Sequence, residues 1–249
     1  MKKYKYKMTI AYDGTNYHGW QIQKNKITIQ DLIQNEISKI LNSKTQITGS
    51  GRTDAKVHAR GQVAHFIVDQ KIPIQRFKHS LNSLLPKDIR VIKIEEVDLS
   101  FHARFSAKSK VYSYHISHDP TPNPFSRFYA YQIKKKLDIN LLKKACSLFI
   151  GKHDFTSFAN KQLEGSAKKN PIRTIQRIAV IEQKNKIIIE FEGDGFLYKM
   201  VRNIVGTLLD VESKKLPIDM IEKIIKAKDR TLASKPAEPQ GLFLDRVEY

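Results

Sequence analysis

Apolar positions in residues 1–106 alternate between the period of a strand and the spacing of a helix. Strands are predicted at 4–12 and 89–97, with shorter ones at 45–48 and 63–68. Helical spacing occurs twice, in a segment with Thr28 as its N-cap and in one that stops at Pro86. The apolar residues of these two helices are Ile29, Leu32, Ile33, Ile37, Ile40 and Leu41, then Phe77, Leu81, Leu84 and Leu85. The order β-α-β-β-α-β is that of a ferredoxin-like unit.

Residues 107–249 roughly repeat this design. An alternating strand is predicted at 110–118, and the proline-rich stretch 119–124 forms a stiff loop after it. The later elements are a helix at 137–150, a strand hairpin at 172–182 and 187–192, helices at about 196–211 and 217–228, and a strand at 241–247. We therefore expect an α+β protein of two halves, 1–106 and 107–249. No low-complexity linker separates them, so one continuous sheet with a cleft between the halves is predicted.

The charge of the chain narrows the class of partner. Lys and Arg number 44 against 25 Asp and Glu, a formal net charge of +19 in 249 residues. Such an excess favours a polyanion as partner, most often nucleic acid, although a lysine-rich composition can also reflect coding bias. No apolar run approaches the length that crosses a bilayer, and a basic N-terminus leads into no secretory segment. Cys146 is the single cysteine, so no internal disulfide can form, and we expect a cytoplasmic protein.

The candidate chemistry lies in a glycine-bearing loop between two short strands. Its sequence is Gly49-Ser50-Gly51-Arg52-Thr53-Asp54-Ala55-Lys56-Val57-His58-Ala59. Two glycines allow positive φ and close approach of another backbone, and charge and hydrogen bonds could hold a carboxylate on such a turn in a cleft. The residues alone leave two other interpretations open. Thr53 and Asp54 are common turn-capping residues, and Arg52 and Asp54 could form an ordinary surface pair.

Three further segments mix aromatic and polar side chains. Residues 11–21 follow a strand and suit base stacking, although a hairpin turn on Asp13-Gly14 explains them equally well. Residues 101–108 interleave aromatic and basic side chains, and residues 193–203 open a helix that contains Arg202. The eight histidines do not have metal-ligand spacing, and no nucleophile-elbow signature is present. A metal site and a serine triad are therefore not expected.

These segments together resemble one family. In the first half the matching stretches are Tyr12-Asp13-Gly14, Gly19-Trp20-Gln21, Gly51-Arg52-Thr53-Asp54-Ala55, Val57-His58-Ala59 and Gly61-Gln62-Val63. In the centre and the second half they are Phe101-His102-Ala103-Arg104-Phe105-Ser106-Ala107, Tyr112-Ser113-Tyr114, Asp154-Phe155-Thr156-Ser157-Phe158, Arg173-Thr174-Ile175 and Met200-Val201-Arg202-Asn203-Ile204-Val205-Gly206. Their order and content are similar to those of the TruA-type tRNA pseudouridine synthases over nearly the whole chain.

The resemblance implies a fold, a reaction and a set of partners. The fold is the α+β pseudouridine synthase fold, with two ferredoxin-like halves that share a mainly antiparallel sheet and hold the active cleft between them. The implied enzyme is a tRNA-modifying isomerase that converts uridine to pseudouridine at positions 38, 39 and 40 of the anticodon stem-loop. It uses no cofactor or metal and acts as a homodimer. The alternatives are a synthase for another RNA and a non-catalytic tRNA-binding protein of the same fold. A glycosidase is disfavoured, because the loop has no second carboxylate near Asp54.

The resemblance also implies roles for four residues. Asp54 matches the catalytic aspartate, and Arg52 matches an arginine that accompanies it in the motif. Tyr112 matches the tyrosine that lies over the target base, and Arg202 matches an arginine that pairs with the aspartate. One departure is Lys56, where the family usually has glycine. If that position requires positive φ, lysine costs about 1 kcal/mol or more.

Overall fold

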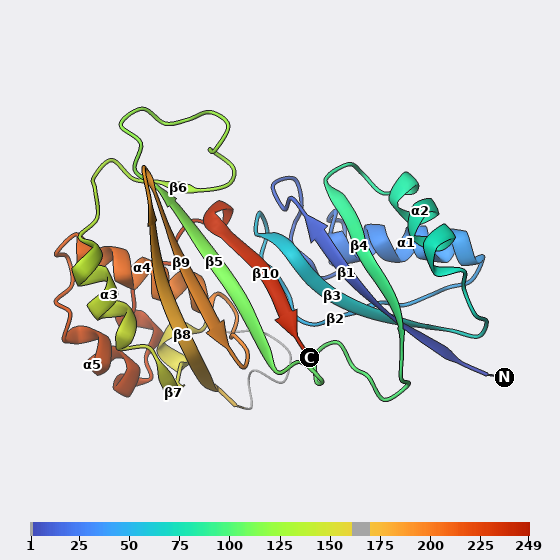
Figure 1. Ribbon diagram of the computed structural model, residues 1–249. Coiled ribbons are helices and arrows are strands. Elements are labelled where there is room, and N and C mark those ends of the chain that lie inside the picture. The colour runs from blue at the N-terminus through green and yellow to red at the C-terminus, as the bar shows by residue number, and fades with distance from the viewer. Residues whose placement is uncertain (1, 161–169) are drawn as a thin grey trace. The chain divides into compact units, whose positions relative to one another are not determined.

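The computed structural model describes residues 2–160 and 170–249. The chain forms two compact units, which Figure 1 shows with their helices and strands labelled. The first unit contains residues 1–108 together with Phe243–Tyr249, and the second contains Ser109–Leu242. The last seven residues thus belong to the first unit, whereas the sequence pattern had assigned them to the second half.

The first unit has a sheet built around strand β1 (Tyr4–Tyr12), which has an antiparallel neighbour on each side. These neighbours are β3 (His58–Val68) and β4 (Ile89–Val97). The short strand β2 (Thr48–Gly49) adds to β3 in antiparallel fashion. Strand β10 (Leu242–Glu248) runs parallel to the start of β3. The sheet is therefore mixed but mainly antiparallel.

The core of the first unit lies between this sheet and helices α1 (Ile29–Leu41) and α2 (Ile74–Leu84), which pack beside each other (Figure 1). Alternate residues of β1, among them Tyr6 and Met8, are fully buried, as the period of a strand requires. The ring of Phe66 on β3 lies 5.6 Å from Tyr6 and 5.8 Å from Phe77 of α2. This run of aromatic rings shows which face of the sheet α2 covers.

Helix α1 begins where the sequence predicts, but Thr28 does not cap it with its side chain. Its Oγ1 is buried and has no hydrogen-bond partner among the described residues. The amides of the first turn bond to backbone instead. Ile29 N donates to Gly19 O at 3.2 Å, and Gln30 N donates to Trp20 O at 3.0 Å. The start of α1 is therefore fastened to the connection that precedes it.

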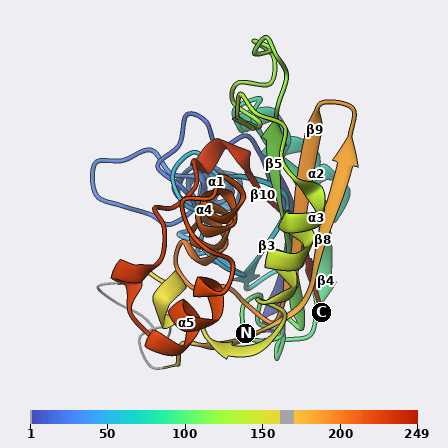
Figure 2. The same cartoon turned by 90° about the vertical axis from the view of Figure 1, so that its left-hand side faces the viewer.

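The second unit has four strands paired antiparallel in the order β5 (Ser109–Ser117), β9 (Lys186–Gly193), β8 (Ile172–Gln183) and β7 (Gly151–Asp154). The two-residue strand β6 (Tyr131–Gln132) pairs parallel with β5. Its helices are α3 (Ile139–Ser147), α4 (Met200–Glu212) and α5 (Met220–Ala227), with 3-10 turns at Thr156–Phe158, Arg230–Leu232 and Pro239–Gly241. Figure 2 shows α3 beside β8 and α4. The α+β class predicted from the sequence is confirmed in both units.

Several predicted boundaries were wrong, each for a local reason. Strand β3 begins at His58 rather than 63, since its first residues pair with β10 from the far end of the chain. Helix α4 begins at Met200 rather than 196, because Lys199 before it has a left-handed backbone (φ 61°). Pro217 is not the first residue of α5 but begins the turn before that helix. The Pro217 carbonyl accepts a hydrogen bond from Met220 N at 3.1 Å. Strand β7 was not predicted.

Candidate functional site

Asp54 lies in a tight turn between β2 and β3. Val57 N donates to Asp54 O at 3.2 Å and closes the four-residue turn 54–57. Asp54 is half-buried, while Ala55 and Lys56 at the tip are exposed. Lys56 has φ 65°, the left-handed value that the third position of a type II turn requires. The position therefore does require positive φ, and lysine there costs about 1–2 kcal/mol relative to an unstrained residue.

The connection between β1 and α1 clamps this turn through its backbone. Trp20 N donates to Thr53 O at 3.1 Å, and Lys56 N donates to Tyr17 O at 3.3 Å. A Cβ atom on Gly19, whose φ is 88°, would lie 2.5 Å from Thr53 O and 3.0 Å from the carbonyl carbon of Asp54. Only glycine allows the two backbones to approach so closely. The connection 13–28 thus holds the Asp54 turn.

The same connection is not a hairpin. Strand β1 ends at Tyr12, and the next element is a helix, so the hairpin interpretation of Asp13-Gly14 is wrong. Asp13 N instead donates to Asp88 O at 2.9 Å, and Gly14 N donates to His58 Nδ1 at 3.1 Å. The ring of His58 stacks on Phe243 of β10 at 4.6 Å. Strand β10 therefore supports the residue that follows the turn.

A buried polar network lies beneath the loop that precedes Asp54. The Tyr12 hydroxyl and Thr53 Oγ1 are 2.8 Å apart, and burial raises the pKa of the Tyr12 phenol. Gln62 Nε2 donates to Gly51 O at 3.1 Å, while its Oε1 accepts from Ser50 Oγ at 2.7 Å. All four side chains, Tyr12, Ser50, Thr53 and Gln62, are buried. A satisfied buried network fixes one arrangement, so the backbone on the N-terminal side of Asp54 is rigid.

This network was missed in the sequence because no short-range pattern reveals it. One signal was available for Gln62, because it lies on the same face of β3 as the buried residues Ala64 and Phe66. A polar residue at a predicted core position of a strand indicates a buried hydrogen-bonding role. Its partners Ser50 and Gly51 could not be named from the sequence.

Arg52 has a different environment from the residues around it. Its side chain is exposed, and Nε donates to Gln21 Oε1 at 3.1 Å. Gln21 belongs to the same connection that clamps the turn. Arg52 and Asp54 thus come from one loop of the first unit, with Arg52 on the exposed side.

Tyr112 and Arg202 both lie in the second unit. Tyr112, on β5, is 8% exposed and makes an edge-to-face contact with Phe196, with ring centroids 5.2 Å apart. Arg202, in the first turn of α4, is also 8% exposed, and its Nε donates to Ala237 O at 2.7 Å. Ala237 N donates back to Arg202 O at 2.9 Å. Each side chain is therefore held in one orientation by its own unit.

The segment that fastens Arg202 is itself anchored to β5. Tyr114 donates its hydroxyl to Glu238 O at 2.8 Å, and burial raises the pKa of this phenol. Residues 237–238 consequently connect α4 with β5, the two elements that carry Arg202 and Tyr112. Of the four predicted site residues, Asp54 and Arg52 belong to the first unit and Tyr112 and Arg202 to the second.

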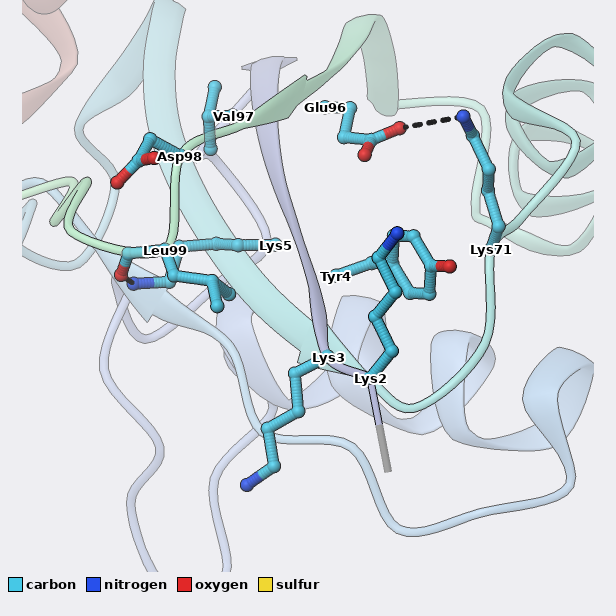
Figure 3. A pocket seen from close by; sticks show the side chains of 9 residues that line it. All are labelled: Lys2, Lys3, Tyr4, Lys5, Lys71, Glu96, Val97, Asp98 and Leu99. Atoms are coloured by element: carbon cyan, nitrogen blue, oxygen red, sulfur yellow. Dashed lines mark hydrogen bonds and ion pairs between the residues drawn. The ribbon is translucent and has the colours of Figure 1, made fainter.

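A separate pocket lies in the first unit at the start of β1. Its volume is about 560 Å³, and its lining includes Lys2, Lys3, Lys71 and Glu96 (Figure 3). Lys71 faces Glu96 at 3.5 Å, and the Nζ of Lys5 donates to the carbonyls of Leu99 and Phe101. The lining contains none of the predicted site residues.

Two classes of site find no support in the described part of the chain. Residues 2–160 and 170–249 contain no group of three or more His, Cys, Asp or Glu side chains placed to hold a metal ion. Cys146 is buried, and burial raises the pKa of its thiol to about 12, so it remains protonated. None of the helices described above has the length and apolar composition needed to cross a bilayer.

A family model and several relatives of this chain agree on one family. The model of the tRNA pseudouridine synthase family matches residues 8–106 and 145–249. A tRNA pseudouridine synthase A 1 from Protochlamydia amoebophila is 52% identical over 98% of this chain and 96% of its own length. A tRNA pseudouridine synthase A from Clostridium kluyveri is 46% identical over 98% of both chains, and one from Limosilactobacillus reuteri is 43% identical over 99% and 97%. A chain of a solved Cbf5-Nop10-Gar1 complex aligns with a TM-score of only 0.37 at 14% identity, covering 96% of this chain and 57% of that one.

Proposed function

Since the chain belongs to the tRNA pseudouridine synthase family, we propose that it isomerises uridine to pseudouridine in tRNA with Asp54 as its catalytic residue. The target uridines are those at positions 38, 39 and 40 of the anticodon stem-loop. The observation that carries the assignment to Asp54 is the fixed turn around it. Backbone hydrogen bonds, a close glycine contact and a buried polar network all hold the backbone that carries this half-buried carboxylate in place. Positioned groups of this kind are what catalysis requires.

The proposed architecture places the four residues in one site. Two ferredoxin-like halves, 1–106 and 107–249, share a mainly antiparallel sheet and form the active cleft between them. The first half supplies Asp54 and Arg52, and the second supplies Tyr112 and Arg202. The enzyme acts in the cytoplasm as a homodimer and needs no cofactor or metal. The family match supports this proposal. The contacts of Tyr112 with Phe196 and of Arg202 with Ala237 support it as well, because they position both side chains.

The reaction breaks the glycosidic carbon–nitrogen bond, turns the uracil, and joins the sugar to carbon five of the base. The carbon-five proton then leaves, and the nitrogen released from the sugar takes up a proton, so the product is an isomer and no oxidant is consumed. A stem uridine must first leave its stack, and unstacking costs roughly a few kcal/mol. Tyr112 replaces part of the lost stacking by lying over the base. Arg202 pairs with Asp54 in this site.

Asp54 has two chemical roles open to it. Its carboxylate either attacks covalently, at the anomeric carbon or at carbon six of the base, or stabilises the charge that develops on the sugar. The carbon-five proton is taken by Asp54 or by Tyr112. Both assignments need only a carboxylate and a phenol within one site.

Release of tritium from tRNA labelled at uridine carbon five tests the function. We expect release from transcripts that retain a uridine at position 38, 39 or 40, and none when all three positions are cytidine. Release from the cytidine transcript would identify a synthase for other uridines. Binding of tRNA without any release would identify a non-catalytic tRNA-binding protein.

A further inference from the structure

Six described residues other than glycine have a left-handed backbone, and Lys56 is unlike the rest. Asn42 and Lys228 are C-caps, and Lys214 directly follows the C-cap of α4, where left-handed residues ordinarily end helices. Asn25 is of a type that tolerates this conformation, and Lys199 precedes the first residue of α4. Lys56 instead lies in the turn that contains Asp54.

The turn around Lys56 cannot relax to an ordinary backbone. The Asp54–Val57 hydrogen bond closes it at 3.2 Å, and the Lys56 amide is bonded to Tyr17 O at 3.3 Å. The backbone of Gly19 also packs closely against the backbone of Thr53, Asp54 and Ala55. Any residue at position 56 must therefore have positive φ, for which glycine is the least strained choice.

The lysine side chain does not compensate for this strain inside the fold. It is exposed and forms no hydrogen bond or ion pair with the described residues. Its ammonium group is an exposed positive charge two residues after Asp54. A strained residue beside a reactive group is a reason to look for a function.

We propose that Lys56 binds a phosphate of the RNA backbone next to the nucleotide on which Asp54 acts. The proposal rests on the proposed function, in that it takes RNA as the substrate of the Asp54 site. A lysine ammonium is a flexible point charge that suits a phosphate, and the chain's net charge of +19 fits the same partner. The contact contributes to substrate binding and not to the bond-breaking step.

Three substitutions separate the charge of Lys56 from its backbone. Lys56→Gly removes both charge and strain, Lys56→Gln removes the charge alone, and Lys56→Arg keeps the charge. Binding of unmodified tRNA is measured by fluorescence anisotropy over a salt series, kinetics by tritium release, and stability by urea unfolding. Lys214→Gly is the matched control, because Lys214 is also an exposed lysine with φ 60°.

We expect Lys56→Gly to raise the urea midpoint and yet weaken tRNA binding about threefold at low salt. The slope of log affinity against log salt falls by about 0.7–0.9, the contribution of one phosphate. KM rises by the same factor and kcat changes less. Lys56→Gln weakens binding equally without the gain in stability, and Lys56→Arg binds like the wild type. Lys214→Gly raises the midpoint and leaves binding unchanged.

Wild-type affinity and salt slope in both Lys56→Gly and Lys56→Gln would overturn the proposal. An equal loss of affinity in Lys214→Gly would also overturn it, because the effect would then be one of general charge. Failure of the proposed function is recognised separately, since the wild type would then bind tRNA and release no tritium. The anisotropy series would still test whether Lys56 binds RNA.

Discussion

Two connections of this chain contrast in how their backbones are held. The loop around Asp54 bonds to residues far away in sequence: Thr53 to Tyr12 and Trp20, Gly51 to Gln62, and Lys56 to Tyr17. The connection 119–129 after β5 bonds mainly within itself. Phe125 N and Ser126 N both donate to Asn123, at 2.9 and 3.0 Å, and Tyr129 N donates to Ser126 O at 2.9 Å.

The connection with fewer long-range hydrogen bonds is also the more exposed of the two. Phe125 at the tip of 119–129 is 86% exposed, whereas Thr53 beside Asp54 is 7% exposed. A connection that bonds mainly to its neighbours in sequence can change shape without disturbing the core. A loop bonded to three other segments cannot. Of these two connections, the one with the proposed catalytic residue is therefore the one that contacts fix to segments distant in sequence.

Replacing Gly19 is the change expected to break this contrast most strongly. In Gly19→Ala the new Cβ would lie 2.5 Å from Thr53 O, and alanine would need φ 88°. We expect a loss of about 2–4 kcal/mol in the free energy of unfolding and a fall in kcat of about 100-fold. Urea unfolding and tritium release measure the two effects.

Phe125→Ala is the matched control in the other connection. Its stability should stay within about 0.5 kcal/mol of the wild type, because the ring is exposed. A Gly19→Ala enzyme with wild-type kcat would show that the position of the Asp54 turn does not limit turnover.

Removing the Tyr12 hydroxyl tests the buried network with less disturbance. Tyr12→Phe leaves Thr53 Oγ1 without this partner, which should cost about 1–2 kcal/mol of stability. We expect kcat to fall about tenfold with little change in KM, because Thr53 precedes Asp54 directly. Tyr17→Phe is the control, since it loses a hydrogen bond to Asp88 and not to the loop. Equal kcat in the two variants would contradict a positioning role for Tyr12.

An effect of pH on stability, and not on turnover, is expected through His65 on the strand that follows the loop. Burial first, then the charges of His102 and Lys5, lower the pKa of His65 to about 4, and Ala103 N donates to its Nδ1 at 3.1 Å. The unfolded chain takes up this proton near pH 6.5, so stability should fall as the pH drops from about 6.5 towards 4. In His65→Gln the urea midpoint should change less with pH over this range. An unchanged pH dependence in the variant would remove His65 as the cause.

The sequence predicted the elements with strong periodicity. The predicted bounds of β1 and β4 coincide with the observed ones, and the hairpin of β8 and β9 lies within a residue of its predicted limits. Long alternating runs determine these strands locally. The four-residue strand β7 was missed because so short a segment has no measurable period.

The surroundings of Asp54 could not be predicted, although the residue itself was named from its motif. Tyr12 and Thr53 are 41 positions apart, and no spacing rule joins them. The capping of α1 failed for a related reason, because the backbone of Gly19 and Trp20 accepts the bonds that Thr28 was expected to accept. Local rules apply until a distant segment offers a better partner.

The most direct test of the catalytic role compares two aspartates. Asp54→Asn removes the carboxylate from the clamped turn, while Asp69→Asn removes one from an exposed position after β3. Tritium release and tRNA binding are measured for both variants under the same conditions. We predict that Asp54→Asn binds tRNA with near wild-type affinity and releases no tritium, while Asp69→Asn does both like the wild type. Near-normal release from Asp54→Asn would contradict the assignment of Asp54 as the catalytic residue.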